Sequence, residues 1–312
     1  LAVLLNAYML SACSINIGAD RSAGHYERDA AGYGANDGVI ERSLSVRPFT
    51  ALECRLPASV TYVQTNDQAP KVVLKGAPAM VERCVVDVRD GKLQLYLVQK
   101  AKQSMKRFSQ SRNQLNITVY GGRLTALAVQ SACTFYAAQL ETSQLALSNA
   151  GASSIRVGRF AGQQLTMSCS GASSTKLAGN VAKLMLNVTG ASSFVANEFT
   201  TQDLKAKVSG ASTAKCALQG SAGVDVSGAS TLTLSGTADL FTIKCSGASS
   251  VKAADLKAQN VVVDVAGASG VKCYAARSIK GTVGCGSLTY GGRPTSYNVE
   301  RQNTSASIKA VD

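Results

Sequence analysis

The sequence predicts an all-β protein built as a single-stranded parallel β-helix with about 20 residues per coil. The first observation is a Gly-Ala-Ser tripeptide that occurs seven times, at a nearly constant spacing of about 20 residues. The second is an alternation of apolar and polar residues on both sides of each tripeptide, a period of two that is typical of strands and not of helices. The third is that the Asn/Leu consensus and helical half of a leucine-rich horseshoe, which has a similar period, are not visible.

The tripeptides are interpreted as the corners at which each strand turns. Glycine permits a backbone conformation that is closed to other residues, and Ala and Ser are small enough for a narrow bend. A catalytic serine in a strained elbow would instead stand in one Gly-x-Ser-x-Gly motif with a His and an acid as partners, so the repeated corner indicates architecture. The predicted corner glycines are Gly151, Gly171, Gly190, Gly210, Gly228, Gly247 and Gly267.

Positions in each coil are counted from its corner glycine. Apolar residues recur at positions −6, −4, −2, +4 and +6, so these positions are predicted to face the core. The serines at position +2 would stack about 4.8 Å apart and can hydrogen-bond along the axis. These serines are Ser153, Ser173, Ser192, Ser212, Ser230, Ser249 and Ser269.

Position +5 lies between two inward positions and therefore faces out. It is basic in five of the seven repeats, and Val195 and Thr233 interrupt the series. One interpretation is a lysine face that keeps the strands soluble and blocks edge aggregation. The other is a stripe that binds an anionic polymer, such as an acidic glycan, lipopolysaccharide or extracellular DNA. The candidate binding residues are Arg156, Lys176, Lys215, Lys252 and Lys272.

The start of the chain predicts export. Residues 1–10 are apolar and uncharged, too few for a membrane span of ~20 residues but suited to the apolar region of a signal peptide. Small residues just before Cys13 predict a lipoprotein signal peptide over residues 1–12, with Cys13 lipidated; the alternative is a chance cysteine after an ordinary signal peptide. Residues 13–38, which hold the only histidine, His25, are predicted to be a flexible tether.

Residues 39–312 are predicted to form one β-helix head domain. Residues 39–114 would be a β flank, in which 84–88 and 93–97 form either a hairpin or successive coil edges. Regular coils are expected from 115 to 290, about nine of them, with Ser131-Ala132-Cys133 as a degenerate first corner. Residues 291–312 are expected to cap the open end. The basic run over 99–113 is interpreted as a solvated loop rather than a nucleic-acid patch.

Besides Cys13, the chain has eight cysteines. Cys169 and Cys245 share position −2, and Cys216 and Cys273 share position +6, but each pair lies several coils apart, too far for a disulfide. They are interpreted as buried small hydrophobes. A disulfide between Cys54 and Cys84 is left open. No Cys-x-x-Cys motif or His/Cys cluster predicts a metal site, and no cofactor is expected.

Several motifs outside the corners resemble the bacterial family of putative auto-transporter adhesins with a head GIN domain, over roughly residues 40 to 310. The resemblance implies a right-handed β-helix of pectate-lyase-like shape, often on exported lipoproteins, and carries over no catalytic residue. The motifs are Glu41-Arg42, Phe49, the runs at 60–64, 91–93 and 124–127, and the closing run at 286–294.

The sequence therefore favours a non-enzymatic cell-envelope lipoprotein of the outer membrane that presents a repetitive face for adhesion or polymer binding. The net charge is +13, which fits an anionic glycan or lipopolysaccharide, although a protein partner is also open and no dedicated nucleic-acid ligand is expected. The alternatives are an envelope scaffold without a ligand and a polysaccharide-lyase-like enzyme, which would need clustered acids for Ca²⁺. Asp225 and Asp264 lie two coils apart with Lys244 between them, which argues against such a cluster.

Overall fold

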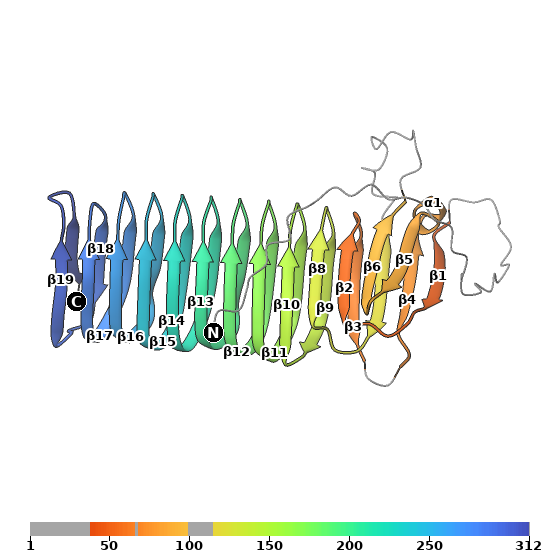
Figure 1. The fold of residues 1–312 in the computed structure, drawn as a ribbon, viewed down its shortest axis with the longest axis horizontal. Coiled ribbons are helices and arrows are strands. Elements are labelled where there is room, and N and C mark those ends of the chain that lie inside the picture. The colour runs from red at the N-terminus through yellow and green to blue at the C-terminus, as the bar shows by residue number, and fades with distance from the viewer. Residues whose placement is uncertain (1–37, 66–67, 99–114, 312) are drawn as a thin grey trace. The chain divides into compact units, whose positions relative to one another are not determined.

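The computed structural model describes residues 38–65, 68–98 and 115–311. This part of the chain is a parallel β-solenoid of about nine turns with roughly 20 residues per turn, as predicted (Figure 1). The predicted signal peptide, Cys13, His25, the tether as far as residue 37 and the basic run at 99–113 lie outside the described residues. The single described helix, α1 (Pro78–Val81), has four residues, so no helix of the described chain could cross a bilayer.

Long strands form the regular coils. From β11 to β17 each strand starts just after one corner and ends just before the next, so a single strand covers two faces of the solenoid, whereas the coils at either end use two shorter strands. The strands are β8 (Ala126–Gln130), β9 (Thr134–Glu141), β10 (Gln144–Asn149), β11 (Ser154–Cys169), β12 (Ser174–Val188), β13 (Ser193–Val208), β14 (Thr213–Val226), β15 (Thr231–Cys245), β16 (Ser250–Val265), β17 (Gly270–Val283), β18 (Ser287–Gly291), β19 (Ser296–Arg301) and β20 (Ser307–Val311).

The corner glycines stack on one another as the repeat predicts. All seven have φ between +66° and +83°, the left-handed region that other residues rarely adopt. The backbone N–H of the alanine after each of the first six donates to the corner carbonyl of the coil before it, as Ala211 does to Gly190 at 2.8 Å. Ser131, with φ +69°, lies beneath Gly151 and confirms the degenerate first corner.

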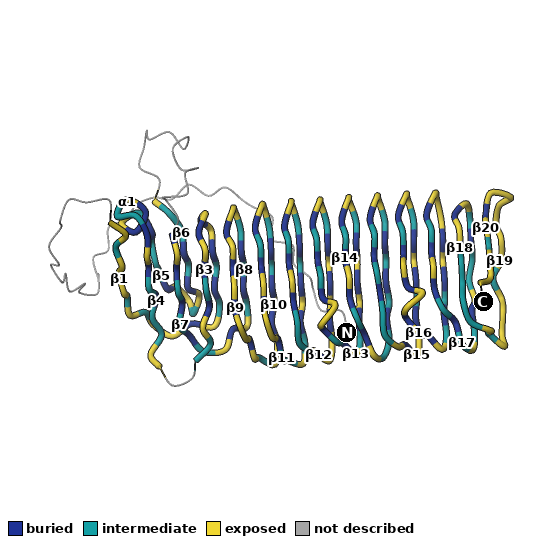
Figure 2. The backbone as a smooth tube through the Cα atoms, turned by 180° about the vertical axis from the view of Figure 1, so that it is seen from behind, coloured by how far each residue is buried: buried dark blue, intermediate teal, exposed yellow. Residues whose placement is uncertain are grey.

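Burial alternates along the regular coils (Figure 2). The predicted inward positions form a continuous core, and the corner serines are at most 3% exposed. Most of these serines donate to main-chain carbonyls of the coil before, at 3.0 to 3.3 Å, as Ser212 does to Gly190. Ser173 donates instead to Ser192. Hydrogen bonding along the axis therefore runs mainly from hydroxyl to backbone.

Two of the predicted inward positions around the corners carry a polar residue instead of an apolar one. Asn149 is fully buried at position −2, where its Nδ2 donates to the carbonyl of Ser174 and to Oγ1 of Thr175, both at 2.8 Å, and its Oδ1 accepts from Ser153. Thr175 is the polar residue at an inward +4 position. These two exceptions to the apolar pattern therefore hydrogen-bond to each other across neighbouring coils, which gives each buried polar group a partner.

The N-terminal flank is made of β1 (Ile40–Ser45), β2 (Ala51–Arg55), β3 (Ser59–Gln64), β4 (Lys71–Gly76), α1, β5 (Cys84–Arg89), β6 (Lys92–Leu97) and β7 (Asn116–Gly121). Its coils do not follow chain order. The coil of β2 and β3 lies between the coil of β6 and β7 and the coil of β8 and β9, with parallel pairing on both sides (Figure 1).

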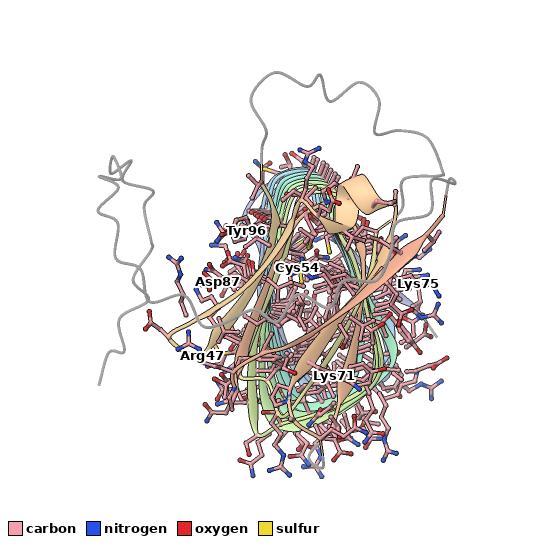
Figure 3. All side chains as sticks on the ribbon, turned by 90° about the vertical axis from the view of Figure 1, so that its right-hand side faces the viewer. Arg47, Cys54, Lys71, Lys75, Asp87 and Tyr96 are labelled. Atoms are coloured by element: carbon pink, nitrogen blue, oxygen red, sulfur yellow. The ribbon has the colours of Figure 1, made fainter. Side chains whose placement is uncertain are left out.

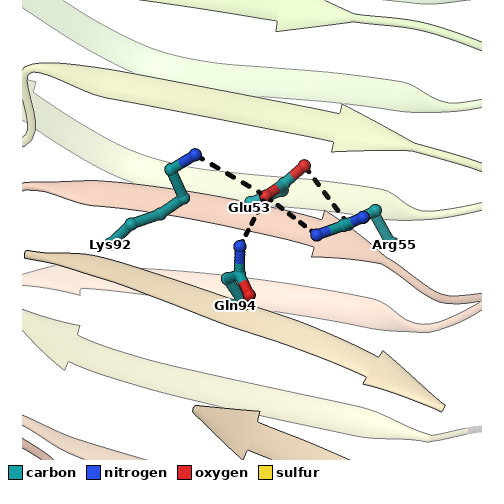
Figure 4. Close-up of polar contacts among 4 residues, drawn as sticks. All are labelled: Glu53, Arg55, Lys92 and Gln94. Carbon is teal, nitrogen blue, oxygen red and sulfur yellow. Dashed lines mark hydrogen bonds and ion pairs between the residues drawn. The ribbon is translucent and has the colours of Figure 1, made fainter. Parts of the chain in front are cut away.

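This order corrects one expectation, and the strand pairing settles one open alternative. β7 does not begin the regular stack, because it lies on the far side of β3 and pairs antiparallel with β4 on its other edge. β5 and β6 form an antiparallel hairpin, which decides between the two alternatives for residues 84–97. A polar cluster then holds β6 against β2: Glu53 accepts from Gln94 at 3.2 Å and forms ion pairs with Arg55 and Lys92 (Figure 4).

Residues 291–311, which were predicted to cap the open end, continue the solenoid. β19 pairs in parallel with β17, and β20 pairs in parallel with β18, so the described residues after 291 build one more coil. The segment lacks a Gly-Ala-Ser corner, which is why the repeat did not reveal it. Charged side chains such as Arg301 and Lys309 line this last coil, a device that discourages edge pairing.

The corner geometry predicts a large penalty for a side chain at Gly210. An added Cβ would lie 2.6 Å from the carbonyl oxygen of Gly190, and φ is +83°. Gly210→Ala is expected to lower the free energy of unfolding by at least about 2 kcal/mol, measured by urea denaturation. The control is Gly223→Ala, where an added Cβ meets nothing within 4 Å; its stability should stay within about 0.5 kcal/mol of the parent. Equal losses in both variants would contradict the assignment.

Candidate binding face

Strand register brings the basic residues predicted at position +5 into one row. The row continues beyond the last Gly-Ala-Ser repeat, because Lys272 pairs with Thr289 and Thr289 pairs with Lys309. At ~4.8 Å per coil the row is roughly 38 Å long. In register order its members are Arg156, Lys176, Val195, Lys215, Thr233, Lys252, Lys272, Thr289 and Lys309. Its six cations are called the basic row below.

The six cations of the basic row are exposed to solvent, and their charge is not neutralised by ion pairs within the described chain. Neighbouring cations are one or two coils apart, or roughly 5 to 10 Å. This spacing is about one Debye length at physiological salt, so their potentials add along the row.

A second row lies beside the first. Position +3 carries a hydroxyl residue in every coil of this region except at Gly270. One inward residue separates position +3 from position +5, so the distance between the two rows along the strand is about 7 Å. The hydroxyl residues are Ser154, Ser174, Ser193, Thr213, Thr231, Ser250, Ser287 and Ser307.

The surface after the corner holds no acid. Positions +1 to +7 contain no Asp or Glu in any of the seven repeats. Sequence reasoning found five of the cations but missed the hydroxyl row, the exclusion of acids and Lys309. The first two could have been read from the same alignment of repeats, whereas Lys309 required knowledge of the last coil. Positions +3 to +7 are called the post-corner face below.

The surface before each corner has a different character. Asp225, Lys244 and Asp264 alternate in register at position −3, as the sequence predicts. Lys183 forms an ion pair with Asp203 at 3.6 Å on the same face. Cations and carboxylates are therefore mixed before the corner and segregated after it. The basic character of the post-corner face is a property of that face and not only of the net charge.

The described part of the chain also contains potential metal ligands and cysteines, which differ in position and burial. No group of three or more His, Cys, Asp or Glu lies close enough there to hold a metal ion. Burial raises the pKa of Cys169 to about 11 and those of Cys216 and Cys273 to about 12, so these thiols stay protonated at neutral pH. They are core residues, as predicted. A hollow of about 590 Å³ beside Phe49 and Arg123 contains no titratable acid or base other than that arginine.

A parallel β-solenoid is a repeat protein, and its stacked coils form an extended surface. The family model of putative auto-transporter adhesins with a head GIN domain matches residues 48–231 and 219–294. The chain belongs to this family, which confirms the resemblance and indicates an adhesin-like protein of the cell envelope or surface. No curated protein matches the chain.

Solved structures with a similar arrangement come from several bacteria. A putative adhesin from Parabacteroides merdae is 15% identical, with a TM-score of 0.49, and the match covers 89% of this chain and 98% of that one. A putative lipid binding protein from Parabacteroides distasonis is 17% identical over the same shares, with a TM-score of 0.47. A putative adhesin from Bacteroides fragilis is 19% identical, with a TM-score of 0.35, covering 90% of this chain and all of that one.

The two faces predict opposite electrostatic effects for the same substitution. Lys272 has Lys252 as its register partner, whereas Lys244 lies between Asp225 and Asp264. At low salt Lys272→Thr should raise the free energy of unfolding by a few tenths of a kcal/mol, and Lys244→Thr should lower it by a similar amount.

Urea unfolding at low salt and at about 0.5 M salt, where screening shortens the Debye length below the coil spacing, tests this difference. Both electrostatic effects should shrink at high salt. Shifts of the same sign and the same salt dependence in the two variants would show that the two lysines have equivalent surroundings.

Proposed function

We propose that this protein is a non-enzymatic, lipid-anchored module of the cell envelope that binds an anionic polymer, with acidic glycan as the favoured class, along its post-corner face. The observation that carries the proposal is the basic row: six exposed cations in register, without an acid on the same face. The adhesin family supports the general role, and the row supplies a specific surface for it.

The geometry favours a polymer over a small anion. Each coil contributes at most one exposed cation to the row, so the contact of one cation with one anionic group would be weak in water. A chain lying along the axis would meet several cations at once, and the later contacts are intramolecular, which raises the overall affinity. The neighbouring hydroxyl row offers donors and acceptors at the same repeat, as a polysaccharide rich in hydroxyl groups would require.

The test compares two sets of four exposed lysines. One set, Lys176, Lys215, Lys252 and Lys272, belongs to the basic row; the control set, Lys205, Lys207, Lys244 and Lys280, lies on the face before the corner. Each set is changed to Gln, so both variants lose the same formal charge. Binding of residues 38–312 to polygalacturonate, lipopolysaccharide, DNA and neutral dextran is measured at low and near-physiological salt.

We expect the basic-row variant to lose polygalacturonate binding by roughly tenfold or more and the control variant to lose much less, with binding that weakens as salt rises. Equal losses would mean that only net charge matters. Failure of the parent protein to bind any anionic polymer would overturn the proposal and leave a protein-binding adhesin or a scaffold. Preference for DNA over the glycan would overturn the favoured class.

The lipid anchor is proposed from the sequence alone, from the apolar segment that ends in small residues before Cys13. A Cys13→Ser variant of the full chain, expressed with its signal peptide in a bacterium that receives labelled palmitate, should carry no label and should leave the membrane fraction. Cys285→Ser, at the one exposed cysteine of the described chain, is the control and should be labelled normally. Labelling of the Cys13→Ser variant would exclude this anchor.

A further inference from the structure

The coil formed by β2 and β3 is held in the stack without a short chain connection to either neighbour. Register partners in neighbouring regular coils are separated by one turn of chain, roughly 20 residues. Cys54, in contrast, pairs with Val129 on one side and with Leu95 on the other. Stacking this coil therefore closes one loop about twice as long as a normal repeat and one almost four times as long, and longer loops cost more conformational entropy.

A pair of cysteines lies at one of these two boundaries. Cys54 occupies position −2 of its coil, and Cys133 occupies position +2 of the next coil, where each of the seven Gly-Ala-Ser corners has a serine. Both side chains are fully buried. Around them the two corners are joined in register, because the backbone N–H of Thr134 donates to Ala58 at 2.9 Å.

Equivalent positions touch one another elsewhere in the solenoid. At three later corners the +2 serine donates to the carbonyl of residue −2 in the coil before: Ser153 to Val129 at 3.3 Å, Ser249 to Val226 at 3.0 Å and Ser269 to Cys245 at 3.2 Å. The same relation places Cys133 beside Cys54, and the Cys133 thiol is the largest cause that raises the pKa of Cys54. Figure 3 shows Cys54 inside the coil, at the N-terminal end of the core.

The partner that the sequence left open, Cys84, is less well placed. It lies on β5, and β6 separates β5 from β2. Two strand spacings amount to about 9.6 Å, beyond the Cα separation of ~7 Å that a disulfide allows. Cys54 and Cys133 lie on directly neighbouring coils.

We infer that Cys54 and Cys133 are a disulfide-forming pair, free thiols in this structure, that staples the β2–β3 coil to the first regular coil. Oxidation needs an external disulfide, such as glutathione disulfide or a protein disulfide donor. One cysteine thiolate attacks that disulfide and releases the first donor thiol. The other thiolate then attacks the mixed disulfide, forming the Cys54–Cys133 bond and releasing the second donor thiol, so two electrons and two protons pass to the donor.

Burial decides when this exchange can happen. The contact with Cys133 and desolvation raise the pKa of the Cys54 thiol well above its usual value, and thiol exchange requires the thiolate. A folded, reduced protein should therefore oxidise slowly, and the bond should form while the two coils are still closing. The inference does not depend on the proposed ligand.

The experiment unfolds residues 38–312 in denaturant with reductant, then refolds the protein with glutathione disulfide and blocks free thiols by alkylation. Trypsin places Cys54, Cys84 and Cys133 on separate peptides, 43–55, 84–89 and 124–156. Mass spectrometry should find 43–55 linked to 124–156. A link from 43–55 to 84–89, or full alkylation of Cys54 and Cys133 in the refolded protein, would overturn the inference.

Two variants complete the test. Cys133→Ser places the residue found at +2 in the seven later corners, so it should fold; its urea midpoint should not respond to reductant, whereas that of the oxidised parent should fall. Cys84→Ser is the matched control from the same region and should keep both the linked peptides and the response to reductant. Polymer binding is measured separately, and its absence has no bearing on the peptide map.

Discussion

Stacking of each corner on the one before it is the interaction on which the rest of the solenoid depends. The alanine N–H of a corner donates to the glycine carbonyl of the previous coil, and an added Cβ on the glycine would come within 2.6 to 3.0 Å of that same oxygen or that of Ser131. Only glycine, already in the left-handed region, permits this approach at each level. The spacing of successive corners nevertheless varies, being shorter from Gly210 to Gly228 than from Gly190 to Gly210. All register shifts between the regular coils fall between position +5 and position −7 of the next corner, on the side of the coil away from the glycine stack.

Unbroken register around the corner explains why surface chemistry is organised in rows. From position −7 to position +5 each residue meets its counterpart in the next coil. Whatever residue type recurs at an outward position there becomes a line along the axis. Lysine and arginine at +5 thus form a line of like charges that costs a few tenths of a kcal/mol per exposed neighbouring pair. Alternating signs at −3 carry no such cost, so the post-corner face gives up a little stability to concentrate charge, which supports a role in recognition.

The repeat made most of the regular fold predictable from the sequence, because each Gly-Ala-Ser corner marks a turn and the alternation around it marks inside and outside. Five of the six cations of the basic row followed from that alignment. Lys309 did not, because its coil has no tripeptide. The spatial order of the N-terminal coils could not be predicted from the sequence either. The position of β7 outside β3 depends on which strand edges are free to pair, and residues 39–121 contain no repeat that would assign the partners. For the same reason the sequence did not reveal that residues 296–311 pair as a further coil.

These two parts of the chain solve the same stacking problem by different means. Neighbouring regular coils are consecutive in the sequence, so only a short loop has to close when one packs on the other. Each interface then adds to a nearly one-dimensional stack. The β2–β3 coil packs against β6 on one side and β8 on the other, and both strands lie much further along the chain. Closing these longer loops costs more conformational entropy, so their stability depends more on specific contacts. Those contacts are present: the Glu53 cluster holds β2 to β6, and Cys54 meets Cys133 at the boundary with β8 and β9. Regular corners need only hydroxyls at that point, because the chain itself already joins the coils.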